Sequence, residues 1–274
     1  MKKFLLLVCT GVLVASCAGG PGVQQSSRQE ATASAAEAAD PPPARLEEIH
    51  SGGHWVTRPS KGTLTVIGIA GRRSNKDEAV AAALADAARK VTLYHGVYGE
   101  SATVLNQGSG NLDYYADFDY RLSFRNTPES FINDLVFDKD SDVLEKDGAV
   151  YVRTKYSGVL DVPDYSSAME DGAPNWVKNY SAVIPGFLAG VGTSKNKGSI
   201  PKTYEASYEN AIASLLPGLS TKVAGESVDV TGAKLTTNIT VSRGSLTNVM
   251  ILETWFDRKT GAVWTLLAAK PTPE

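Results

Sequence analysis

The chain has 274 residues, and 27 lysines and arginines against 30 aspartates and glutamates give a formal net charge of −3. This acidic balance argues against a nucleic-acid partner, which usually requires a basic face. The two cysteines, Cys9 and Cys17, both precede the predicted folded part, so neither a disulfide framework nor a cysteine-liganded metal is expected, and the sequence indicates no cofactor.

Residues 1–16 have the pattern of an export signal. Lys2 and Lys3 form a positive start, and the apolar run from Phe4 to Val14 is too short to span a bilayer. The run ends in the letters VASC at residues 14–17, which resembles the lipobox of bacterial lipoproteins. The resemblance implies cleavage before Cys17, with diacylglycerol on its sulfur and an acyl group on its amine. An ordinary secretory signal is the alternative.

Acyl chains on Cys17 would hold the protein on a membrane without crossing it, because two or more chains at one residue bind a bilayer stably. Ala18 and Gly19 stand where inner-membrane lipoproteins of Gram-negative bacteria tend to carry aspartate, so the resemblance implies the outer membrane, with the folded part periplasmic or surface-exposed. Loss of Lys2 and Lys3 with the signal leaves 25 basic and 30 acidic residues, a charge of −5.

Residues 17–53 are predicted to be the lipidated cysteine followed by a disordered tether. The stretch is rich in Ala, Ser, Gln, Glu and Pro, and it buries too little apolar surface to offset its ordering entropy. The rest of the chain is long enough for two small domains. We expect an α+β fold in two tandem related modules, at residues 54–163 and 174–270.

In the first module, Trp55 precedes a predicted strand from Leu64 to Ala70, and a basic loop leads to a predicted helix from Asp77 to Tyr94. Apolar residues recur along this helix at a spacing of three and four, which indicates a face packed on a sheet. Alternation of apolar and polar residues then predicts a strand from Tyr114 to Phe124. Asp147 and Gly148 indicate a hairpin between strands at 142–146 and 149–156.

The second module has the same predicted order. Trp176 precedes a strand at 187–192, and a loop with Lys195 and Lys197 leads to a helix from Lys202 to Leu216. Strands are then predicted at 235–242, 249–256 and 262–269. A shift of 124 residues places Gly68 on Gly192 and Ala87 on Ala211, and a shift of 113 places Gly148 on Gly261. These matches predict a strand, a helix and about three antiparallel strands in each module. Chance likeness of two α+β domains is the alternative.

The chain resembles the bacterial lipoprotein family of the Helicobacter surface lipoprotein Lpp and the flagellar outer-membrane lipoprotein FlgP. The lipobox at Cys17, the lead-in tryptophans, the strand ends at 67–70 and 191–194, and the alanine-rich helix at 79–91 carry this resemblance. It implies a non-catalytic α+β module of the cell envelope that assists assembly of surface or flagellar structures. Two copies in one chain depart from the single module of that family.

No catalytic signature is present. His50 and His54 lie at the end of the tether, and His95 closes a predicted helix, where a cap is the expected role. Asp138 to Asp142 imitates the start of a calcium loop, but Val143 replaces the turn glycine and Ala149 replaces the bidentate glutamate. We therefore interpret that stretch as a solvated turn and the protein as not an enzyme.

Two other features could bind a partner. Basic residues precede both helices, at Arg72, Arg73 and Lys76 and at Lys195 and Lys197, and a helix start beside a cation favours an anion; solvated loops are the alternative. Exposed strand edges could pair with another chain, with contacts from Tyr98, Tyr114, Tyr115 and Trp255 unless these lie in the core.

The sequence thus predicts a lipid-anchored, non-catalytic structural or assembly factor of the cell envelope. Its expected partners are the membrane, envelope or flagellar proteins, and further copies of itself. The alternative is a periplasmic binding module for an anionic ligand such as a peptidoglycan fragment.

Overall fold

A computed structural model of the chain describes residues 54–57, 59, 62–108, 115–159, 161–230 and 233–272, with side chains except at 103–118 and 221–238. The predicted signal, the lipobox with Cys17, the predicted tether with His50, and Tyr114 lie outside the described residues. All described residues belong to one compact unit that runs from Pro43 to Glu274.

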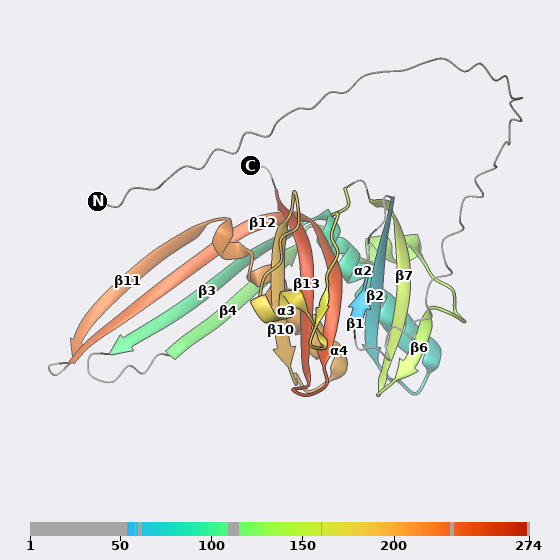
Figure 1. Ribbon diagram of the computed structural model, residues 1–274, viewed down its shortest axis with the longest axis horizontal. Coiled ribbons are helices and arrows are strands. Elements are labelled where there is room, and N and C mark those ends of the chain that lie inside the picture. The colour runs from blue at the N-terminus through green and yellow to red at the C-terminus, as the bar shows by residue number, and fades with distance from the viewer. Residues whose placement is uncertain are drawn as a thin grey trace, which may run out of the picture. The chain divides into compact units, whose positions relative to one another are not determined.

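The unit is α+β, as predicted, and the described strands within it pair in antiparallel orientation (Figure 1). The larger sheet follows the order β10-β13-β12-β3-β4, with β1 and β11 also on β12. Its strands are β1 (His54–Val56), β3 (Val97–Gly108), β4 (Tyr115–Phe124), β10 (Leu188–Lys195), β11 (Thr221–Val230), β12 (Ala233–Asp257) and β13 (Ala262–Pro271).

A smaller sheet consists of four strands from the first half of the chain, in the order β2-β7-β5 with β6 also on β7. These are β2 (Gly62–Gly71), β5 (Leu135–Val136), β6 (Val143–Lys146) and β7 (Ala149–Val159), and β8 (Met169–Glu170) and β9 (Ala173–Pro174) form a separate ribbon. The helices are α2 (Lys76–His95), α3 (Asn175–Asn179) and α4 (Ile200–Ala213), with 3-10 turns η1 (Pro128–Asp134) and η2 (Leu216–Gly218).

Helix α2 packs on β2 through its alanines. The Asn75 side chain accepts a hydrogen bond from the backbone N–H of Asp77, which caps the first turn, and Gly96 ends the helix with a φ of 139° that favours glycine. Ala83 and Ala87 are fully buried. A Cβ atom on Gly68 of β2 would lie 1.9 Å from the carbonyl oxygen of Ala83, so the strand backbone touches the helix directly.

Helix α4 packs on β10 in the same way. A Cβ atom on Gly192 would lie 2.1 Å from the backbone nitrogen of Ala211. The predicted bounds of this helix, Lys202 to Leu216, are wrong at both ends. The helix begins at Ile200, because a proline is tolerated in the first turn, as Pro201 shows here, and it ends at Ala213, after which the chain tightens into η2.

Strand β12 joins the sheet together. Two separate strands were predicted within it, but it runs unbroken over 25 residues and bends where Asn248 takes a φ of 50° and the register with β13 shifts. Its first half pairs with β11 on one edge and β3 on the other. Its second half pairs with β13 and β1. Neither β3 nor β11 was assigned from the sequence.

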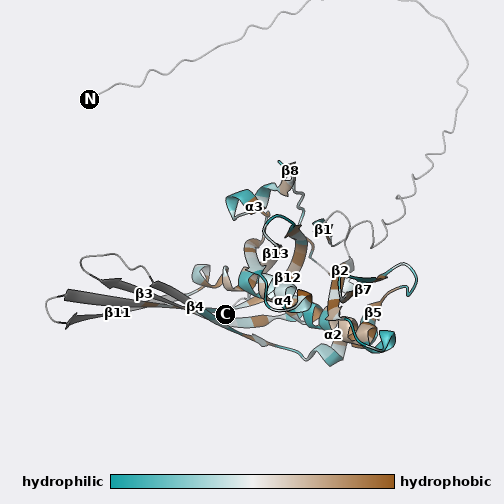
Figure 2. Cartoon of the chain, turned by 90° about the horizontal axis from the view of Figure 1, so that it is seen from below, coloured by the Kyte–Doolittle hydropathy of each residue, from teal (hydrophilic) through white to brown (hydrophobic). Residues whose placement is uncertain are grey.

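The core draws on both halves of the chain. The largest buried cluster contains Leu64, Val66 and Val91 from the first half and Trp176 and Leu266 from the second. Figure 2 shows hydrophobic stretches where the helices meet the strands. The two stretches expected as modules therefore share one sheet and one core within the compact unit.

Candidate functional site

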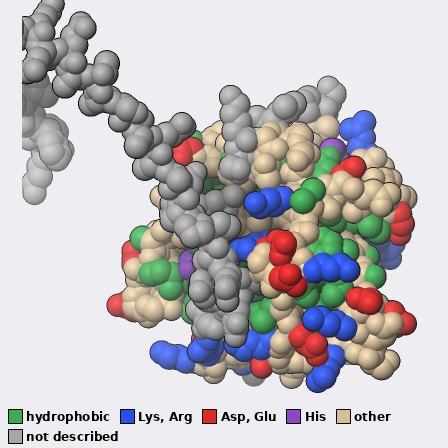
Figure 3. Space-filling model, turned by 90° about the vertical axis from the view of Figure 1, so that its right-hand side faces the viewer, with side chains coloured by type: hydrophobic (Ala, Val, Ile, Leu, Met, Phe, Trp, Pro, Cys, Tyr) green, Lys and Arg blue, Asp and Glu red, His purple; other side chains and the backbone are tan. Residues whose placement is uncertain are grey.

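The first basic loop lies between β2 and α2 at the surface. The exposed guanidinium of Arg72 pairs with Glu145 of β6 at 2.8 Å, and the Arg72 backbone N–H donates to the carbonyl of Gly148. Arg73 and Lys76 are exposed. On the face drawn in Figure 3, lysine and arginine side chains are interspersed with aspartate and glutamate side chains. Arg72 therefore has an acidic neighbour, although an exposed ion pair of this kind contributes at most about 1 kcal/mol to stability.

The second basic loop borders a cavity. The space, of about 460 Å³, is lined by Lys195, Ser199 and Thr203 near the start of α4 and by Thr260 and Gly261 of the β12–β13 turn. The backbone N–H of Lys197 donates to the Thr203 hydroxyl, which in turn donates to the carbonyl of Ser199. Of the five predicted basic residues, Lys195 lines this cavity, and the structure does not bring the two loops together around it.

A second cavity, of about 410 Å³, lies beside the first, and four aromatic rings, two basic residues and Asp147 contribute to its lining. Trp55 of β1 stacks on Tyr204 of α4 at 5.2 Å, and it meets Tyr151 of β7 edge-on at the same distance. Lys146 and Arg258 also line the space. Burial raises the pKa of Tyr151 to about 12, so its phenol stays neutral over the physiological range. The surface is therefore aromatic with cations among its lining residues.

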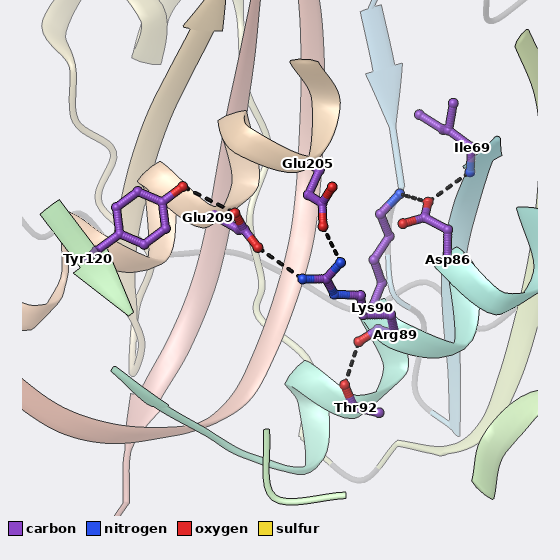
Figure 4. A network of polar contacts seen from close by, with 8 residues as sticks. All are labelled: Ile69, Asp86, Arg89, Lys90, Thr92, Tyr120, Glu205 and Glu209. Carbon is purple, nitrogen blue, oxygen red and sulfur yellow. Dashed lines mark hydrogen bonds and ion pairs between the residues drawn. The ribbon is translucent and has the colours of Figure 1, made fainter. Parts of the chain in front are cut away.

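A chain of charged groups joins α2, α4 and β4 (Figure 4). The guanidinium of Arg89 contacts Glu205 and lies 3.1 Å from Glu209, and the Tyr120 hydroxyl donates to the second Glu209 oxygen at 3.1 Å. Burial, and then the nearby Glu205 charge, raise the pKa of Glu209, whereas Tyr120 and Arg89 oppose this rise. Each charge has a named partner within the fold, which indicates a clamp between the two helices.

Lys90, only 6 % exposed, is held beside this clamp. Its ammonium donates to the carbonyl of Ile67 at 2.6 Å and to Asp86 at 2.7 Å, and the same Asp86 oxygen accepts from the backbone N–H of Ile69 at 2.8 Å. A buried lysine is a candidate nucleophile when it faces a cavity without a partner. This ammonium instead pairs with a carboxylate and a strand carbonyl, which is a structural arrangement.

Glu253 of β12 connects His54 of β1 with Trp176 of α3. The carboxylate is 2 % exposed and accepts from Trp176 Nε1 at 2.7 Å, with His54 Nε2 at 2.8 Å. Burial opposes its ionisation, but hydrogen bonds from His54, Ser167 and Trp176 hold its pKa below the usual value. Sequence reasoning missed this residue, although a single carboxylate within the apolar run at 249–255 was the available signal.

The remaining predicted positions have local roles. The Asp138 carboxylate accepts from the backbone of Asp140 and Ser141, and Asp142 pairs with Arg153, so these carboxylates bind their own turn and its neighbouring strand, as interpreted. His95 lies 2.8 Å from the Tyr156 hydroxyl and stacks on Phe131.

The structure also describes two of the residues that were predicted to contact another chain, Tyr98 and Trp255. Tyr98 is exposed and donates to Glu100, Trp255 packs against the main core cluster, and nothing is described for the side chain of Tyr115. Among the described residues no group of three histidine, cysteine or acidic side chains could hold a metal ion.

No known protein family, curated protein or solved structure matches this chain. Within the part of the chain that the structure describes, no helix combines the length and apolar character needed to cross a membrane.

Proposed function

We propose that the protein is an outer-membrane lipoprotein that acts as a non-catalytic structural or assembly factor of the cell envelope, serving flagellar or other surface structures. The observation that carries the proposal is the four-stranded part of the larger sheet, β11-β12-β3-β4, which extends beyond the helices (Figure 1) and carries no described strand on its two outer edges. Strand edges bind other chains through backbone hydrogen bonds.

The absence of an enzymatic role is supported by how the titratable groups are used. The candidates for acid, base or nucleophile, Glu209, Lys90 and Glu253, each bind partners from the protein itself. A catalytic group needs access to a substrate and a position to act on it. The proposal that the chain works through contacts therefore agrees with these arrangements.

We further propose that the fold arose from two tandem related modules that became interlocked. Gly68 pairs with Val152 across β2 and β7, and Gly192 pairs with Thr265 across β10 and β13. Gly68 and Gly192 are 124 residues apart, and Val152 and Thr265 are 113 residues apart. These are the two shifts by which the sequence itself matches its first half to its second. In both pairs a helix follows the glycine-bearing strand and packs onto it.

The lipid anchor rests on the sequence, at Cys17, and is tested by metabolic labelling. Cells that express the full chain are fed labelled palmitate and separated into inner-membrane, outer-membrane and soluble fractions. The wild-type chain should carry label and sediment with the outer membrane. Cys17→Ala should lose both properties, and the matched control Cys9→Ala should retain them. Full membrane association of exported Cys17→Ala would contradict the anchor.

The assembly role is tested in intact envelopes by chemical cross-linking of the lipidated chain and identification of the companions. Structural components of a surface apparatus or further copies of the chain are the expected result. Recovery of wall-degrading enzymes with transfer of their activity to the purified complex would contradict it.

One observation favours the alternative, a periplasmic binding module for an anionic ligand: Lys195 lines a cavity at the start of α4, where backbone N–H groups and the helix dipole favour an anion. Titration of the chain with a peptidoglycan muropeptide would show saturable binding that is lost in a Lys195→Ala and Lys197→Ala variant. An Arg72→Ala and Arg73→Ala variant is the matched control, because those side chains do not line the cavity, and it should bind as the wild type does. The binding is measured by isothermal titration calorimetry, and the absence of a heat of binding with the wild-type chain would contradict this alternative.

A further inference from the structure

The two outer edges of the extended sheet have equal length. Strand β4 (Tyr115–Phe124) forms ten residue pairs with its inner neighbour β3. Strand β11 (Thr221–Val230) forms ten residue pairs with its inner neighbour β12. In the part of the chain that the structure describes, each of them pairs with one strand alone. Neither strand contains proline, which native proteins often place on an edge to prevent pairing.

The outward-facing backbone groups can be assigned from two hydrogen bonds at the strand ends. The N–H of Arg125 donates to the carbonyl of Gly96, so the odd-numbered residues of β4 face β3. The N–H of Arg243 donates to the carbonyl of Ser220, so the even-numbered residues of β11 face β12. The outer edge of β4 therefore carries the backbone groups of its even-numbered residues, and that of β11 carries those of its odd-numbered residues.

An independent contact supports this assignment. The backbone N–H of Tyr120, an even-numbered residue of β4, donates to the side chain of Asp119 at 2.9 Å. An N–H that bonded to β3 would not be directed at this carboxylate, so Tyr120 lies on the outer edge as the alternation requires.

The two edges suit each other. The four strands β11, β12, β3 and β4 alternate in direction, so β4 and β11 run antiparallel within one chain. Bringing β4 of one copy beside β11 of another copy then makes an antiparallel pair of two ten-residue strands, which continues the alternation. One chain thus carries both partners of a head-to-tail contact.

One face of the extended sheet also exposes apolar side chains at three of the positions whose side chains the structure describes. Ile239 and Val241, both 40 % exposed, and Tyr98, 38 % exposed, lie on the same face, because residues opposite each other in the register share a face. On the other face, η2 and the residue after it cover the base of the sheet, where Leu216 touches Gly99 and Leu219 touches Gly244. Exposed apolar surface of this kind favours association.

We propose that copies of this chain associate head to tail, with the β4 edge of one copy paired to the β11 edge of the next, so that one sheet runs through successive copies. This inference rests on the proposed function and names the partner that the sheet edges take. A heterologous contact continues into a ring when its rotation closes and into a filament when it does not.

The test uses proline at an outward-facing position of each edge. Ala116→Pro removes an outer N–H of β4, and Ser227→Pro removes one of β11, and neither position donates to the inner ladder, so both should fold. The full-length lipidated chain in detergent is studied by native mass spectrometry and light scattering. The wild type should form assemblies larger than two copies, and each proline variant alone should be a single copy.

Mixing the two variants is the decisive measurement. The Ala116→Pro chain keeps its β11 edge and the Ser227→Pro chain keeps its β4 edge, so a mixture should form a one-to-one pair with twice the mass of one chain and no larger species. Ala116→Ser and Ser227→Ala retain the N–H groups and should assemble as the wild type does. Circular dichroism spectra matching the wild type show that the variants are folded.

The proposal would be overturned by a wild-type chain that stays a single copy, by proline variants that assemble as the wild type does, or by a mixture that forms no pair. An effect of Ala116→Pro without an effect of Ser227→Pro would indicate β4–β4 pairing and would also overturn it. Because these measurements report mass alone, a single-copy chain that still cross-links to envelope proteins would reject self-assembly and leave the proposed function standing.

Discussion

Gly68 and Gly192 have the same relationship to the helix that follows each of them: added Cβ atoms would lie 1.9 Å and 2.1 Å from helix backbone atoms, in α2 and α4 respectively. The alanine-rich face of α2 and the small residues Ser207 and Ala211 of α4 permit this approach. Two strand–helix contacts in one fold thus depend on the absence of a side chain at Gly68 of β2 and at Gly192 of β10, and Gly190 of β10 makes a similar approach to α4.

We expect Gly68→Ala and Gly192→Ala each to lower the free energy of unfolding by about 1–3 kcal/mol or more, because the helix backbone cannot move away without loss of packing. Urea unfolding followed by circular dichroism measures this change. Gly71→Ala and Gly218→Ala are matched controls, since a Cβ atom there meets nothing within 4 Å. Equal effects at all four positions would contradict the contact as the cause.

Glu253 should make stability depend on acid pH. Its pKa is lower in the folded protein than the ordinary value of 4.5, so the stabilisation is present above about pH 4.5 and is lost as pH falls through the folded-state pKa. Glu253→Gln should lower stability at pH 7 by about 1–3 kcal/mol, since buried partners lose a charged acceptor. It should also flatten the decline in stability between pH 5 and pH 3, measured by urea unfolding at each pH. A variant with an unchanged slope would contradict the assignment.

His95 should add a second pH dependence at higher pH. Burial lowers its pKa from the ordinary value of 6.5, so the neutral ring stabilises the fold above about pH 6.5, and this contribution is lost as pH falls towards the folded-state pKa. His95→Phe keeps an aromatic ring against Phe131 but cannot be protonated. Thermal unfolding at pH 7.5 and pH 5.5 should show a smaller difference for this variant than for the wild type. Tyr156→Phe, which removes the hydroxyl that contacts His95, is the matched control and should keep the titration.

Arg89 should stabilise the contact between α2 and α4. Arg89→Met leaves Glu205 and Glu209 close to each other without the cation, and we expect a loss of about 1 kcal/mol, because the guanidinium is a third exposed and solvent screens the pair. A double-mutant cycle with Glu209→Gln isolates the interaction. Raising the salt concentration should weaken the coupling. Additive losses in the cycle would show that the two residues do not interact.

The alternating and periodic stretches were readable from the sequence because their patterns reflect burial. The alanine stripe of α2, the hairpin at Asp147 and Gly148, and the alternation in β4 all correspond to elements close to their predicted bounds. The predicted start of α4 lay two residues late, since Pro201 is tolerated in the first turn, and its predicted end lay three residues late, since the chain tightens into η2 after Ala213.

The pairing of strands that lie far apart in the chain could not be predicted from the sequence. Strand β3 and strand β11 lie in polar, Gly-containing stretches, and their place depends on β12, which is more than a hundred residues from β3. The two expected modules were drawn as consecutive stretches, but β1 and β3 of the first half pair with β12 of the second. The aromatic cavity of Trp55, Tyr151 and Tyr204 likewise assembles residues whose meeting no local pattern indicates.

The short strand β1 determines how mechanical load would reach the fold. Any pull transmitted along the residues before His54 enters at a strand of three residues. This strand is held by the contact of His54 with Glu253, by Trp55 at 4 % exposure, and by Thr57, whose N–H and hydroxyl bind β12 carbonyls. Because β12 also pairs with β11 and β3 of the extended sheet, force on the leading segment passes to the strand that supports the proposed contact edge of β11. The proposed anchor and the proposed contact between copies would thus both load strand β12. Tension applied at β1 would be transmitted along the β12 backbone to the extended sheet without passing through the helices.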